Sequence, residues 1–178
     1  MQEDILIKNL KNVATQETAF SELVSNYKER LYWHIRRIVL DHDDTDDVLQ
    51  NTFIKVFQNI NSFKEESAVY TWLYRIATNE ALSFLKKKAT IFNTSSEELQ
   101  SFLVENLKAD VYFDGDEIQL KLQQAIASLP EKQRLVFNMK YYEEMKYEDI
   151  SKILDTSVGG LKASYHHAVK KIEAFLKD

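Results

Sequence analysis

Two of the chain's three glycines stand side by side in the stretch SVGGLKASYHHAVKKIEAFL, residues 157–176. Its apolar residues recur every three or four positions, which predicts a helix. A glycine inside a helix costs roughly 0.5–1 kcal/mol relative to alanine, so the pair needs an explanation. If Ser157 caps the helix, Gly159 and Gly160 fall in the first turn, where no side chain keeps a phosphate from the free backbone N–H groups. The stretch therefore indicates contact with a phosphate backbone.

The polar residues of the same stretch suit a nucleic acid as well. The preceding segment YEDISKIL and a tight DTS turn complete the outline of a helix-turn-helix. The alternative is a C-terminal amphipathic helix with a solvated basic edge. The candidate DNA contacts are Ser157, Gly159, Gly160, Lys162, Ser164, His166, His167, Lys170 and Lys171.

A second candidate is the aromatic-rich stretch NSFKEESAVYTWLYRIATN, residues 61–79. Bases of single-stranded nucleic acid stack on aromatic rings at roughly 1–3 kcal/mol each, and cations follow the phosphates. Glu65 and Glu66 oppose a nonspecific phosphate groove, so contact here should be selective. The alternative is that Trp72, Tyr74 and Ile76 are core residues, and the sequence leaves Trp72 open between the two.

A third candidate is the predicted helix DDVLQNTFIKVFQNI, residues 46–60, of which one face is apolar and is expected to be core. Ile54 falls on the polar side instead, among acidic and amide residues. An exposed apolar residue in such surroundings indicates a protein-binding face, although a solvated helix surface is the simpler alternative. The candidate face consists of Asp46, Asp47, Gln50, Asn51 and Ile54.

Enzymatic and metal chemistry find no support in the sequence. Of the four histidines, His166 and His167 are adjacent on a helix and point about 100° apart, so they rarely share one ion. The HDD triplet at 42–44 lacks the further ligands of a metal phosphohydrolase. No phosphate-binding glycine loop and no nucleophile–base set is present. We expect no catalytic residues, no metal and no cofactor.

The composition indicates an all-α protein. The 178 residues include only three glycines and one proline, which are too few for the many turns of a sheet protein. Cysteine is absent, which suits a reducing cytoplasm. The N-terminus does not resemble a signal peptide, and no apolar run is long enough to span a membrane. The expected location is cytoplasmic, without membrane insertion.

The charge pattern divides the chain. The formal net charge is −5, and residues 89–118 carry one basic against seven acidic side chains. We expect an N-terminal helical domain over 1–88, an acidic linker over 89–118 and a C-terminal helix-turn-helix domain over 119–178. The alternative is a single domain in which the middle segment is a surface helix. Because domains of this size bury little surface, each half should need a further packing partner, which is either the other half or an inhibitor.

The expected helices follow from apolar periodicity and capping residues. The N-cap of the helix predicted over 45–60 is expected to be Asp44 or Thr45. Pro130 is expected at the start of a helix, where proline is tolerated. The predicted ranges are 16–40, 45–60, 70–88, a short helix near 96–107, 117–128, one from Pro130, 147–154 and 157–176.

Four stretches taken together resemble the extracytoplasmic-function (ECF) sigma factors, the small promoter-recognition subunits of bacterial RNA polymerase in the sigma-70 family. They are TDDVLQNTFIKVF, FKEESAVYTWLYRIATN, LPEKQRLVFNMKYYEEMKYEDISKIL and SVGGLKASYHHAVKKIEAFL. The resemblance covers about residues 18–88 and 119–176. It implies two helical domains tied by a linker that runs through the polymerase.

The resemblance implies a partner for each candidate. The face with Asp46 and Gln50 would dock on a coiled coil of the largest polymerase subunit, and the polymerase flap region is a further expected contact. Residues 61–70 would capture a base flipped out of the minus-10 element in melted DNA, and the helix-turn-helix would read the minus-35 element in double-stranded DNA. An anti-sigma factor is a partner that the family allows. The implied minus-10 residues are Asn61, Ser62, Phe63, Lys64, Ser67, Tyr70, Arg75, Asn79, Lys86 and Lys87.

The last helix departs from the family pattern because arginines usual there are replaced, among others by Ser164 and His167. Arginine forks bind guanine in a bidentate way worth roughly 1–3 kcal/mol of discrimination. The sequence therefore predicts a weak or differently specific minus-35 contact through backbone N–H groups, lysines and histidines.

Two other classes of protein remain in competition. A regulator that binds an operator through its helix-turn-helix would bind DNA without polymerase, but it leaves residues 44–79 unexplained. A helical adaptor would use only the face around Ile54.

Overall fold

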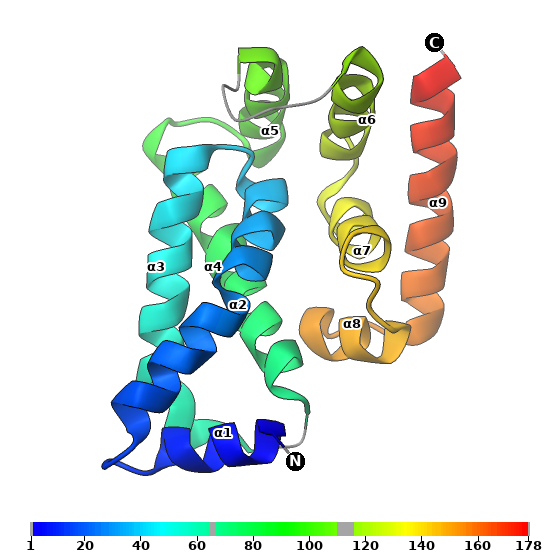
Figure 1. Ribbon diagram of the computed structural model, residues 1–178. Helices are drawn as coiled ribbons and strands as arrows, with labels where there is room; N and C mark the ends of the chain where they lie inside the picture. The colour runs from blue at the N-terminus through cyan, green and yellow to red at the C-terminus, as the bar shows by residue number, and fades with distance from the viewer. Residues whose placement is uncertain (1, 65–66, 110–115, 178) are drawn as a thin grey trace.

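The computed structural model describes residues 2–64, 67–109 and 116–177 (Figure 1). Over these ranges every regular element is a helix, which confirms the all-α fold class. Glu65 and Glu66, expected to make the 61–70 contact selective, lie outside the described residues, as does Gly115.

The N-terminal half consists of α1 (Gln2–Lys11), α2 (Gln16–Val39), α3 (His42–Asn59), the short 3₁₀ helix η1 (Ile60–Ser62) and α4 (Val69–Ile91). The sequence did not predict α1. Its apolar side chains Leu6, Ile7 and Leu10 are buried in the main core, so this short helix is fixed by packing. Helix α4 continues past residue 88, where the first domain was expected to end.

Helix α3 begins three residues earlier than expected, because its cap is neither Asp44 nor Thr45. The carboxylate of Asp41 accepts a hydrogen bond from the Asp44 backbone N–H at 2.9 Å and caps the helix. The Asp44 carboxylate forms an ion pair with Lys88 of α4 instead. The first turn of α3 is thereby tied to the end of α4.

The acidic middle segment contains the expected short helix, α5 (Ser96–Glu105), followed by the 3₁₀ helix η2 (Asn106–Ala109). A capping box of Ser95 and Glu98 starts α5. Leu99 and Leu103 are buried in a small cluster with Ala89 at the end of α4. The Gln100 amide donates to the carbonyls of Ala127 and Leu129, between α6 and α7. Helix α5 therefore bridges the two halves.

The C-terminal half consists of α6 (Glu117–Ala127), α7 (Glu131–Tyr141), α8 (Tyr147–Leu154) and α9 (Val158–Lys177). Pro130 lies at the N-cap of α7, one position before the first helical residue. Helices α8 and α9 form the expected helix-turn-helix, and Asp155 turns the chain between them in the left-handed region, at φ 50°.

The two halves share one hydrophobic core. Helix α8 packs against α4, and α7 packs against α2 (Figure 1). Ile150 and Ile153 of α8 are buried in the same cluster as Leu73 and Ala77 of α4. A second cluster, around Phe137, lies within the C-terminal half. In this structure the halves pack on each other, which is one of the two arrangements that the sequence led us to expect.

Candidate functional site

The start of α9 has the capping geometry that the glycine pair predicted. The Ser157 hydroxyl accepts a hydrogen bond from the Gly160 backbone N–H at 3.2 Å. A Cβ at Gly160 would lie 3.2 Å from that Ser157 oxygen, whereas a Cβ at Gly159 would meet nothing within 4 Å. The two glycines thus have different roles: Gly160 makes room for the cap, and Gly159 leaves the outer side of the first turn open.

One side of α9 is exposed and the other is core. Leu161, Ala168 and Ile172 are buried, and the Tyr165 ring stacks on Phe137 at 5.7 Å. The basic side chains therefore project away from the domain. The exposed members of the predicted set are Ser157, Gly159, Lys162, His166, His167, Lys170 and Lys171, whereas Gly160 and Ser164 are partly buried.

The residues predicted to contact melted DNA are distributed along the segment before α4 and along α4 itself. Most are exposed, as a binding surface requires. The exposed members are Asn61, Ser62, Lys64, Arg75, Asn79, Lys86 and Lys87, and the partly buried ones are Ser67 and Tyr70.

Phe63 was predicted among the contacts to the minus-10 element, but its ring is buried in this structure. Its ring is only 4% exposed and packs on Trp72 with the ring centroids 5.0 Å apart. The Lys11 ammonium lies 5.9 Å from the centroid of the same ring. Because protein groups occupy its surroundings, Phe63 supports the segment and offers no ring to a base.

Trp72 is both a packing residue and a surface residue. It is partly buried against Phe63, and it also lines a groove between the end of α3 and α4. The sequence singled out Ser62 and Asn79 on this groove, and it missed four polar neighbours on α3 and α4. The groove is lined by Lys55, Asn59, Ser62, Trp72, Ile76, Asn79, Glu80 and Ser83.

The C-terminal half covers part of the α4 surface. The Tyr70 hydroxyl donates a hydrogen bond to the Asp149 carboxylate of α8, and burial together with this bond raises the pKa of Tyr70. Arg75 and Asn79 line a cleft whose other wall includes Glu131 of α7 and Asp155 of the helix-turn-helix. In this arrangement acidic residues of the C-terminal half lie at the place predicted for DNA phosphates.

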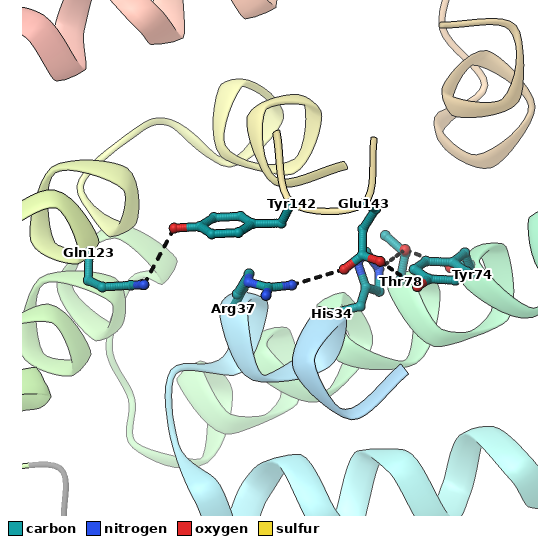
Figure 2. Close-up of polar contacts among 7 residues, drawn as sticks. All are labelled: His34, Arg37, Tyr74, Thr78, Gln123, Tyr142 and Glu143. Carbon is teal, nitrogen blue, oxygen red and sulfur yellow. Dashed lines mark hydrogen bonds and ion pairs between the residues drawn. The ribbon is translucent and has the colours of Figure 1, made fainter. Parts of the chain in front are cut away.

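A polar cluster that the sequence did not reveal joins the halves (Figure 2). The Glu143 carboxylate accepts hydrogen bonds from the Arg37 guanidinium at 2.9 Å and from the Tyr74 hydroxyl at 2.6 Å. The Arg37 guanidinium also lies 4.1 Å from the centroid of the Tyr142 ring. The Glu143 side chain is only 8% exposed. The pKa of the Tyr74 hydroxyl is raised mainly by burial, and further by its hydrogen bond to Glu143 and by the charge of that carboxylate. We call these four residues the interdomain latch.

His34 lies beside the latch and is buried without charge. Its Nε2 is 2.8 Å from the Thr78 hydroxyl oxygen, and that hydroxyl donates to the Tyr74 carbonyl. Nε2 must therefore carry the proton, which leaves Nδ1 buried without a partner. Burial, assisted by the charge of Arg37, lowers the pKa of His34 to about 3.

The predicted protein-binding face on α3 is exposed as a unit. Asp46, Asp47, Gln50, Asn51 and Ile54 are all exposed, and the Ile54 side chain is 52% exposed. Phe57, one turn further on, is also exposed and adds an aromatic ring that the sequence analysis did not include. The opposite side of α3 packs against α2 and α4 through Val48, Leu49 and Val56.

Neither a metal site nor a membrane span is found in the part of the chain that the structure describes. No group of three or more His, Cys, Asp or Glu side chains there could hold a metal ion. Among the described helices, none has the length and apolarity to cross a bilayer.

Comparison with known proteins identifies both halves. The family model for Sigma-70 region 2 matches residues 23–91, and the model for Sigma-70, region 4 matches residues 119–172. The ECF RNA polymerase sigma factor SigW of Bacillus subtilis is 30% identical, with 99% of both chains covered. The ECF RNA polymerase sigma-E factor of Haemophilus influenzae is 33% identical over 87% of this chain and 86% of that protein.

Two solved structures share the fold. CnrH, in complex with the cytosolic domain of CnrY, has a TM-score of 0.71 at 19% identity and covers 98% of this chain and 97% of its own. The sigma factor RpoE from Bartonella quintana, in complex with the anti-sigma factor NepR, has a TM-score of 0.69 at 20% identity. The match covers 89% of this chain and 96% of RpoE.

The fold and its exposed faces define a two-part helical protein that ends in a helix-turn-helix. The chain belongs to the sigma-70 family, within the ECF RNA polymerase sigma factors. As such it binds core RNA polymerase and promoter DNA and directs transcription initiation. The predicted resemblance is confirmed.

Proposed function

We propose that this chain uses three separate surfaces to start transcription. The α3 face binds a coiled coil of the largest polymerase subunit. The segment 61–70 and the exposed side of α4 hold the melted minus-10 element, and the exposed side of α9 reads the minus-35 element. The chain contributes binding and no catalysis of its own, and it works together with the polymerase in the cytoplasm. Its functional units are residues 1–88, 89–118 and 119–178.

The observation that carries this proposal is the exposure of Ile54 and Phe57 on α3, at 52% and 44%. A monomer gains nothing by presenting two neighbouring apolar side chains to water, so this surface fits a protein partner. Asp46, Asp47 and Gln50 continue the surface one and two turns earlier and offer polar groups around it. The C-terminal half leaves this face uncovered, so the isolated chain can present it to polymerase.

The minus-10 surface is only partly available in the isolated chain. Tyr70 is bonded to Asp149, and the cleft at Arg75 contains acidic groups. Helix α8 must therefore leave α4 before this surface can hold DNA along its whole length. We infer that polymerase, by holding the two halves at separate places, opens the chain. An anti-sigma factor would act in the opposite direction, by keeping the halves together or by covering the α3 face.

Run-off transcription with purified core polymerase tests the proposal. A pool of genomic promoters is transcribed with and without the chain, and specific start sites should appear only when the chain is added. An operator-binding regulator would instead bind DNA without polymerase and give no new start sites, which would refute the proposal.

A matched pair of variants tests the α3 face. Ile54→Ser is expected to weaken binding to core polymerase about tenfold, because truncation of a buried apolar contact at an interface costs on the order of 1–2 kcal/mol. Asn59→Ser, at an exposed position of the same helix about 140° around the axis from Ile54, should bind like the parent. Cosedimentation with core polymerase measures both. Equal binding by the two variants would show that Ile54 does not contribute to the polymerase interface.

A further inference from the structure

Helix α1 lies outside the region 2 match, which begins at residue 23, yet it contacts the segment that leads into α4. In Figure 1, α1 crosses the end of the molecule at which α4 begins. Leu6, Ile7 and Leu10 anchor it in the main core, so its polar side chains are held at fixed places relative to that segment.

Two polar side chains of α1 bind the segment at its two ends. The Lys11 ammonium donates a hydrogen bond to the Phe63 carbonyl at 2.9 Å. The Glu3 carboxylate accepts one from the Val69 backbone N–H at 2.6 Å. Phe63 and Val69 are themselves buried, so each bond joins α1 to a fixed point of the backbone.

Glu3 supplies a cap that α4 does not have in its own sequence. The N-cap residue of α4 is Ala68, whose side chain has no hydrogen-bond acceptor. A carboxylate near the first turn satisfies a free N–H group and interacts favourably with the positive end of the helix dipole. The start of α4 therefore depends on a residue 66 positions earlier in the chain.

We propose that α1 is a positioning element for minus-10 recognition, in which Glu3 and Lys11 fix the two ends of the segment 63–69. Neither residue touches the DNA. Their effect is to fix Phe63 and Val69, the two ends between which the flipped base is proposed to be captured. This inference rests on the proposed role of residues 61–70 in minus-10 recognition.

The test is base preference in the assembled holoenzyme. Promoters randomised across the minus-10 element, with a fixed minus-35 element, are transcribed by polymerase carrying each variant, and the transcripts are sequenced. Glu3→Ala and Lys11→Met remove the two hydrogen bonds. Glu3→Gln keeps an acceptor for Val69, and Lys8→Met changes an exposed lysine one turn earlier on the same helix.

Loss of one such bond is expected to reduce discrimination at the captured base about three- to tenfold in Glu3→Ala and Lys11→Met. Glu3→Gln and Lys8→Met should keep the preference of the parent. Preferences within a second library, randomised at minus-35, should not change in any variant. Because methionine keeps the apolar stem of Lys11 over Phe63, Lys11→Met carries the test alone if Glu3→Ala fails to fold.

Two outcomes would overturn the proposal: unchanged minus-10 preference in Lys11→Met, or an equal loss of transcription across every promoter of both libraries. The second outcome would mean that α1 only stabilises the fold. If the parent itself shows no minus-10 preference, the proposed function fails instead, so the two failures are distinguishable.

Discussion

Gly159 and Gly160 are adjacent, but their surroundings predict opposite effects of substitution. Gly159→Ala should leave the free energy of unfolding unchanged or raise it by up to about 1 kcal/mol, because the added methyl group meets nothing and alanine favours the helix. Gly160→Ala should lower it by up to about 1 kcal/mol, because the methyl group crowds the Ser157 oxygen and the weakened cap outweighs the helix preference of alanine. Urea unfolding of both variants measures the difference.

The same pair tests the minus-35 role of the α9 start. If a phosphate approaches the first turn, the methyl group of Gly159→Ala should reduce run-off transcription from promoters that need a minus-35 element, although the protein is no less stable. Promoters that depend mainly on minus-10 serve as the control. Full activity of Gly159→Ala on both promoter types would show that no backbone comes close to this turn.

His34 predicts a pH dependence of stability. Its pKa is about 3 in the folded protein and near 6.5 in the unfolded chain, so the unfolded chain binds the proton first as the pH falls. The contribution of neutral, buried His34 to the free energy of unfolding is therefore fully present above pH 6.5, and it is lost as the pH falls from there toward 3. Between pH 7.5 and 5.5 the free energy of unfolding should fall by about 1 kcal/mol more in the parent than in His34→Gln.

Glutamine is the suitable replacement because its amide N–H can still donate to the Thr78 hydroxyl. Urea unfolding at both pH values gives the two slopes, and subtraction removes the contribution of the other titrating groups. Parallel slopes in parent and variant would mean that His34 is not the group responsible.

At the scale of elements, α5 predicts that the acidic middle segment contributes to stability. Gln100→Ala should lower the free energy of unfolding by about 1–2 kcal/mol, because the carbonyl of Leu129 loses its donor and that of Ala127 keeps only Arg134. Ser101→Ala, at the next and exposed position, should have no effect. Limited proteolysis between α4 and α6 gives a second measurement, and equal cleavage of both variants would contradict a bridging role.

How much the sequence predicts depends on how local the interaction is. The helix over 147–154 was predicted with its exact bounds, because its apolar residues repeat over two turns and a turn follows directly. The cap of α3 was misplaced because three acidic residues, Asp41, Asp43 and Asp44, compete within four positions. Helix α1 was missed because the interactions that hold it are distant in sequence: it packs on α2 and η1, and Glu3 and Lys11 bind backbone groups before and at the start of α4.

The candidate contacts follow the same rule. The exposure of Ile54 was predictable from the helical period of one element. The burial of Phe63 was not, because Lys11 and Trp72 cover it from outside the segment. Glu143 gave no signal in the sequence, since its partner Arg37 lies 106 positions away and reaches it only when the two halves pack together.

At the scale of the whole molecule, acidic groups lie beside the α4 surface that is proposed to bind DNA. The α5 segment exposes Glu97, Glu98 and Glu105, and the C-terminal half places Glu131 and Asp155 across from Arg75. In this arrangement Glu131 and Asp155 would oppose a phosphate beside Arg75, and Lys132 lines the same cleft. The proposed separation of the halves would remove Glu131 and Asp155 from that surface and leave the lysines of α9 exposed.

The interdomain latch predicts how to open the chain without polymerase. Glu143→Gln removes the charge that pairs with the Arg37 guanidinium in a mostly buried site, which should disfavour the closed arrangement by about 1–3 kcal/mol. The radius of gyration from small-angle X-ray scattering should rise. A fluorescent single-stranded minus-10 oligonucleotide should bind more tightly to the free protein, because α8 no longer covers Tyr70.

Glu144→Gln makes the same change of charge at the next residue, which is exposed, and should behave like the parent. If both variants gain affinity equally, net charge alone is responsible; if neither does, Glu143 does not hold the halves together.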